Sequence, residues 1–74
     1  MKGDIVVKVK LGSMKKSIEN FGADRYLIKT DSTEHNTANR DIVTMLSRYM
    51  GIPENKIILK SGLASEDKVF QLVM

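Results

Sequence analysis

The segment from Thr37 to Gly51 constrains the fold most, because it is the one stretch of this chain with a continuous helical pattern. Apolar residues recur in it at steps of three and four, which places them along one face of a helix. These residues are Ala38, Ile42, Met45, Leu46, Tyr49 and Met50. Either Asn36 or Thr37 can cap the first turn. Gly51 can adopt the left-handed conformation that closes a helix, before Pro53 prevents its continuation. The pattern predicts one amphipathic helix that needs an apolar partner surface.

Four short segments that alternate apolar and polar residues are predicted to be strands and to supply this surface. They cover 4–11, 25–30, 56–60 and 68–74. The connection over 12–24 is polar and irregular, and only Ile18 and Phe21 are expected to anchor it in the core. The predicted fold is α+β, in two layers. One main helix covers one face of a four-stranded sheet, mixed or antiparallel, with the order β-β-α-β-β along the chain.

Size and composition narrow the class of protein further. The chain has 74 residues and no cysteine, which leaves room for one domain with one small core and no disulfide. No apolar run exceeds three residues, so we expect no membrane-spanning helix. The alternating start of the chain is unlike a signal peptide and is expected to belong to the fold. Absence of cysteine is typical of a reducing compartment, and we expect a cytoplasmic protein.

Catalytic chemistry has little support in the sequence. His35 is the only histidine, and it is expected in a polar loop without a partner. Glu66 and Asp67 are the only adjacent acidic pair, and two ligands are too few for a calcium site. No glycine-rich phosphate loop or nucleophile motif occurs. We therefore predict a non-enzymatic protein with no catalytic residues, metal or cofactor.

Basic residues are concentrated in the first part of the chain. Residues 1–30 contain seven Lys or Arg and three Asp or Glu. Four of them would line up on one sheet face if the first two strands pair: Lys8, Lys10, Arg25 and Lys29. Such a stripe can contact phosphates without reading bases, although lysines also serve merely to keep a strand face solvated. All four aromatic residues are assigned to the core, which leaves none for stacking on bases. Weak, sequence-nonspecific RNA binding is thus the alternative function.

The second half of the chain resembles the YggU-like family of small uncharacterised proteins. The similarity lies in TAN at 37–39, RYMGIP at 48–53 and KIILKSGLASEDKVFQL at 56–72. The start matches more loosely, through DIVVKVK and KKSIENFGADRYLIK. The resemblance implies a single YggU-like domain over 1–74, with a four-stranded sheet whose first and last strands are neighbours at its centre. It also implies that the helix usual after the last strand is missing here. The molecular function of the family is not established.

The resemblance carries the family's shared polar set onto Asn39, Ser61, Gly62, Ser65 and Lys68. An anion site near the start of the helix is one interpretation, because free N–H groups favour negative charge there. The other interpretation is structural, with side chains bracing loops and Gly62 supplying a positive φ. Two cations of the family pattern are replaced, one in the approach over 32–37 and one at Glu66. An anion is therefore expected to bind more weakly than in the family.

A set of apolar side chains is expected to point away from the helix: Val6, Leu27, Ile58, Val69 and Val73. A contiguous apolar patch usually marks a contact surface, so we predict a homodimer or a docked protein partner at this open sheet face. The leading hypothesis is accordingly a binding or protein-interaction module of unknown molecular function.

Overall fold

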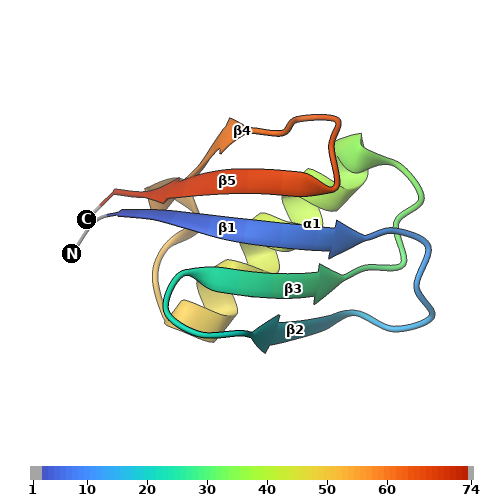
Figure 1. Cartoon of the computed structure of the whole chain (residues 1–74), viewed down its shortest axis with the longest axis horizontal. Coiled ribbons are helices and arrows are strands. Elements are labelled where there is room, and N and C mark those ends of the chain that lie inside the picture. The colour runs from blue at the N-terminus through green and yellow to red at the C-terminus, as the bar shows by residue number, and fades with distance from the viewer. Residues whose placement is uncertain (1–2, 74) are drawn as a thin grey trace.

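The computed structural model describes residues 3–73 and contains five strands and one main helix (Figure 1). The elements are β1 (Gly3–Lys10), β2 (Ser17–Asn20), β3 (Arg25–Lys29), α1 (His35–Met50), a 3₁₀ turn (Glu54–Lys56), β4 (Ile57–Ser61) and β5 (Asp67–Leu72). The strands form one sheet in the order β2-β3-β1-β5-β4. β1 and β3 are parallel and the other pairs antiparallel. The α+β class with a mixed sheet is confirmed. The predictions of four strands and of the order β-β-α-β-β are wrong, because three strands rather than two precede α1.

The strand that the sequence analysis missed is β2, which lies at one edge of the sheet. It has four residues, and Ile18 is its one apolar side chain, packed partly against the core. So short an edge strand shows no period of two that distinguishes it from a loop. The turn to β3 uses positive φ angles at Gly22 (112°) and Ala23 (25°), which closes the β2–β3 hairpin.

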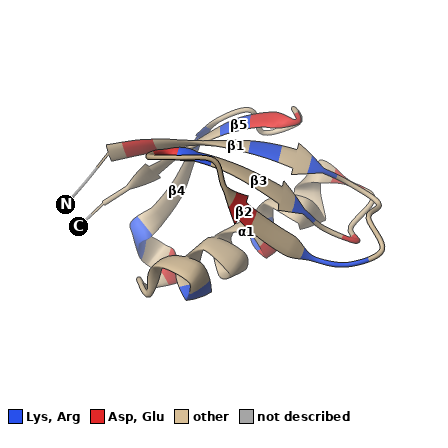
Figure 2. Ribbon diagram, turned by 60° about the horizontal axis from the view of Figure 1, so that its bottom comes forward, with Lys and Arg blue, Asp and Glu red and all other residues tan. Residues whose placement is uncertain are grey.

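The core lies between the sheet and α1, which covers one face only (Figure 2). Its buried apolar residues are Ile5, Val7, Val9, Ile28, Ala38, Ile42, Leu46, Ile57 and Phe70. β1 contributes alternate residues to it and pairs directly with β5, with Ile5 opposite Phe70. The expected pairing of the first and last strands is therefore confirmed, with β1 at the sheet centre.

The helix starts earlier than predicted. His35 belongs to its first turn, and Glu34 occupies the cap position without a side-chain hydrogen bond. The hydroxyl of Thr37 instead donates to the Glu34 carbonyl at 3.1 Å. The predicted end is confirmed, since Gly51 is left-handed with φ 70°.

Tyr49, expected on the apolar stripe of the helix, is 53% exposed, because it lies at the margin of the interface between α1 and the sheet.

The last strand ends before the predicted boundary. It stops at Leu72, and the predicted terminal residue, Met74, lies outside the described residues. Within residues 3–73, no helix is both long and apolar enough to cross a membrane.

The core makes a direct prediction about stability. Leu46→Ala removes a fully buried side chain and is expected to lower the free energy of unfolding by about 2–5 kcal/mol. Urea unfolding followed by circular dichroism measures it. Arg48→Ala, on the exposed side of the same helix, should change stability by less than about 1 kcal/mol. Equal effects of the two substitutions would contradict the packing described.

Candidate functional site

The outer face of the sheet lies opposite α1 (Figure 2). The exposed positions of β1 and β3 place the predicted basic stripe on this face. Parallel pairing of β1 with β3 sets Lys10 beside Lys29 and Lys8 beside Leu27. In the same register Arg25 lies beside Val6. Because side chains alternate along each strand, all four basic residues project on this one face. We call the part of it formed by β2, β3 and β1 the basic half.

Ion pairs divide the charges of the outer face into two groups. Lys8 lies 3.2 Å from Asp67, and Lys60 lies 2.8 Å from Asp4. The other three members of the stripe have no such partner within residues 3–73. Their positive charge is therefore available to an external anion.

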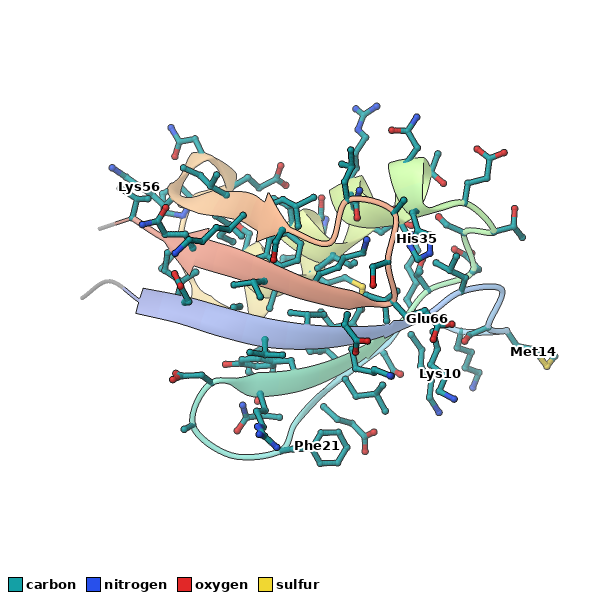
Figure 3. All side chains as sticks on the ribbon, turned by 45° about the horizontal axis from the view of Figure 1, so that its top comes forward. Lys10, Met14, Phe21, His35, Lys56 and Glu66 are labelled. Carbon is teal, nitrogen blue, oxygen red and sulfur yellow. The ribbon has the colours of Figure 1, made fainter. Side chains whose placement is uncertain are left out.

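An aromatic side chain lies exposed next to this basic stripe. The sequence analysis predicted the stripe but placed this side chain in the core. Phe21 is 63% exposed rather than a core anchor, and it points away from the body of the protein (Figure 3). It borders a shallow hollow of about 290 Å³ together with Val6, Lys8, Arg25 and Tyr26. Its N–H donates to the Arg25 carbonyl at 2.8 Å, which fixes its backbone beside the start of β3. Phe21 directly follows β2 and, two residues after Glu19, falls on the outer face. Because β2 could not be recognised as a strand, the sequence offered no clear signal for this exposure.

The apolar residues of the predicted contact surface are less contiguous than expected. Val6 is 46% exposed and pairs with Val69, while Leu27 lies diagonally next to Val6. Ile58 lies beside Gln71 on the edge strand. Val73 lies beyond the end of β5, four residues or about 14 Å along the strand from Val69. The structure thus brings three of the five together, and a contact role for them stays a prediction.

The polar set carried over from the YggU-like resemblance comes together at the loop between β4 and β5. The ammonium group of Lys68 donates to the carbonyls of Gly62 (2.7 Å) and Leu63 (3.2 Å). Asn39 donates to the Leu63 carbonyl at 3.1 Å, which ties the loop to the start of α1. Ser65 accepts a hydrogen bond from the N–H of Asp67 at 3.0 Å. These bonds brace the loop, and its anion-binding role stays a prediction.

Two backbone features complete the loop. Ser61 pairs with Val69 at an irregularity of the β4–β5 ladder. Gly62 has φ 85°, and a Cβ there would lie 2.2 Å from the Asp67 carbonyl oxygen. Only glycine fits such a position without moving the backbone.

Lys68 is fully buried, which its place in a polar set did not predict. It points to the helix side of the sheet, as Phe70 does, and satisfies its charge with carbonyls rather than with a carboxylate. Burial lowers the pKa of the Lys68 ammonium group, because a charged group is poorly solvated there.

A second polar network joins the segment between β3 and α1 to Asp41 of the helix, and Lys16 of the β1–β2 connection adds an ion pair to it. The hydroxyls of Ser32 and Thr30 donate to Asp41, and the Thr30 bond is 2.8 Å long. The Lys16 ammonium lies 3.7 Å from the same carboxylate. The Ser32 and Thr30 hydrogen bonds and the Lys16 charge lower the pKa of Asp41, although partial burial acts in the opposite direction. The hydrogen bonds hold the segment after β3 against α1, and the ion pair directs Lys16 to the same carboxylate.

No metal centre is formed in the part of the chain that the structure describes, where no three His, Asp or Glu side chains converge. A scan against models of known protein families finds none that matches this chain. Membership of the YggU-like family therefore stays a prediction from the motifs.

The buried ammonium group makes a pH-dependent prediction. Because the pKa of Lys68 in the folded protein lies below its ordinary value of 10.5, the unfolded chain binds more protons there between these two values. The contribution of Lys68 to the free energy of unfolding should therefore increase as the pH rises from the folded pKa to the unfolded pKa. The same contribution is lost when the pH falls through the folded pKa. Urea unfolding of the wild type and Lys68→Met from pH 7.5 to pH 10.5 measures it. A stability difference that is independent of pH would contradict the burial of the charge.

Proposed function

We propose that this domain is a non-enzymatic binding module that holds single-stranded RNA on the basic half of its sheet. The main observation in support of the proposal is that the ring of Phe21 is exposed beside Arg25 and Lys8. A cytoplasmic location and a YggU-like origin are parts of the same proposal.

The chemistry of this surface suits an unpaired strand. Ammonium and guanidinium groups attract phosphates by releasing counterions, whatever the base sequence. An exposed aromatic ring adds stacking, which stabilises by about 1–3 kcal/mol per base and accepts any base. Bases in a duplex are already stacked on each other, so the ring favours unpaired RNA. Together these features support weak and sequence-nonspecific binding.

The charge distribution supports an RNA strand over a protein at this half of the face. Lys10, Arg25 and Lys29 have no carboxylate partner within the described range. A protein covering them has to supply matching acidic groups or leave charges desolvated, which is costly. A phosphate backbone supplies regularly spaced negative charge.

Removing the aromatic ring of Phe21 is expected to lower the affinity for single-stranded RNA. Phe21→Ala should weaken binding of a fluorescent single-stranded oligonucleotide by roughly 5- to 150-fold in an anisotropy titration. Leu63→Ala, which also removes an exposed apolar side chain, is the matched control and should bind as the wild type does. Wild-type affinity should also fall steeply as salt rises from about 50 to about 200 mM. Unchanged affinity of Phe21→Ala, or equal binding of duplex RNA, would rule out the stacking role.

A second candidate function is self-association or protein docking through Val6, Leu27 and Val69. The half-exposed Val6 lies directly beside Val69, and adjacent apolar side chains of this kind are common in contact surfaces. This candidate uses the middle of the outer face, next to the basic half.

Light scattering over a concentration series tests the second candidate. Val69→Glu should reduce any dimer by at least about tenfold in association constant, because burying a carboxylate there is unfavourable. Leu63→Glu adds the same charge on the β4–β5 loop and should leave association unchanged. A wild-type protein that stays monomeric at its highest soluble concentration eliminates the homodimer.

A further inference from the structure

We infer that the carboxyl ends of β1 and β3 form a binding site for a terminal phosphate group of the RNA strand. The inference rests on the proposed function for the source of the phosphate. It adds a second site, at the opposite end of β3 from Phe21. There Lys15, which the sequence analysis did not single out, joins Lys10 and Lys29 of the basic stripe.

Three lysines converge at this end of the sheet. Lys10 and Lys29 are register partners and the last residues of two parallel strands. Ser17 of β2 pairs with Lys29 on the other side. With Lys15 and Met14 of the following loop they border a hollow of about 660 Å³, and no carboxylate is among the described residues that line it. Figure 3 shows Lys10 and Met14 together at this end, far from Lys56.

The loop that carries Lys15 is held in place by the fold. The N–H of Gly12 donates to the Ser32 carbonyl at 2.8 Å, and the N–H of Ser13 donates to the Thr30 carbonyl at 2.9 Å. Lys16 is directed to Asp41, so the two consecutive lysines have different environments. Lys15 is therefore presented at the hollow from an anchored segment, which limits the entropy lost on binding.

The topology indicates that an RNA strand ends here rather than passing through. β3 lies between β1 and β2, so the chain from β1 to β2 has to cross the carboxyl end of β3 (Figure 1). An RNA strand that starts at Phe21 and follows β3 covers four residues, or about 13 Å, before it meets this loop. The outer face is thus bounded at the three lysines.

The charge of the hollow matches a phosphate monoester. A terminal phosphate carries a charge of about −1.5 to −2 at pH 7, because its second pKa is near 6. An internal phosphodiester carries only one negative charge. Three ammonium groups around one hollow therefore favour the terminal group, through short charge-assisted hydrogen bonds.

The test compares three forms of one single-stranded oligonucleotide: a 5′-phosphate, a 3′-phosphate and hydroxyls at both ends. At pH 7.5 one phosphorylated form should bind about tenfold more tightly than the hydroxyl form in an anisotropy titration. The difference should shrink below pH 6, where the monoester gains a proton. Lys15→Ala should abolish the difference. Lys56→Ala removes the same charge at the other end of the protein and should preserve it. Circular dichroism verifies that both variants fold.

The outcomes separate this inference from the proposed function. Equal affinity of all three oligonucleotides for the wild type would overturn the phosphate site and leave RNA binding intact. If no RNA binds, amide resonances of residues 12–17 are followed by NMR during addition of pyrophosphate. Shifts that Lys15→Ala abolishes would support the phosphate site without RNA as its source, whereas unchanged resonances would overturn the phosphate site too.

Discussion

The packing of α1 against the inner face of the sheet is the interaction on which the rest of the structure depends. Ala38, Ile42 and Leu46 form one stripe, which contacts alternate residues of the strands. A single helix covers a single face, so every second side chain of each strand is left on the outer side. The basic residues of β1 and β3 therefore share one surface because their neighbours in sequence are buried.

Parallel pairing of β1 with β3 determines where each basic residue lies on that surface. The pairing sets Lys10 beside Lys29 at one end and leaves Arg25 beside Val6 at the other. The β2–β3 hairpin then places Phe21 at the Arg25 end, and the β1–β2 connection places Lys15 at the Lys29 end. An aromatic hollow and a lysine-lined hollow are thus separated by the length of β3.

The loop between β4 and β5 has a different role from the outer face. Lys68 and Asn39 direct their donors to the loop carbonyls, on the helix side of the sheet. A buried ammonium group that is satisfied by carbonyls stabilises one loop conformation, because leaving it unpaired would be costly. The polar set that the YggU-like resemblance singled out therefore braces this loop through its hydrogen bonds, and its anion-binding role stays a prediction. The proposed RNA surface uses other residues.

The sequence predicted the features that depend on many residues at once. The helix stripe extends over several turns and the strand alternation over several residues, so Leu46 and Phe70 were assigned correctly to the core. Features that depend on one or two residues were missed. β2 has only Ile18 facing inward, and the exposure of Phe21 depends on where the hairpin turn begins. The burial of Lys68 was also missed. Alternation along β5 places Lys68 on the same face as the buried Phe70, but a lysine is usually expected to face water.

The lysine-lined hollow at the ends of β1 and β3 is the feature that the sequence predicted least. The basic stripe was predicted from alternation together with the assumption that the first two predicted strands pair, which β1 and β3 do. The convergence of Lys15 with Lys10 and Lys29 requires the position of a loop, which is set by hydrogen bonds to Thr30 and Ser32. Local patterns carry no information about such contacts between distant segments.

One measurement tests the central claim that the outer face is the binding surface. It is a ¹H–¹⁵N NMR titration of the protein with a single-stranded RNA oligonucleotide. The account predicts shifts concentrated in β1, β3 and the residues around Phe21, with the exposed side of α1 near Arg48 unchanged. Shifts concentrated on α1, or none at saturating RNA, would contradict it.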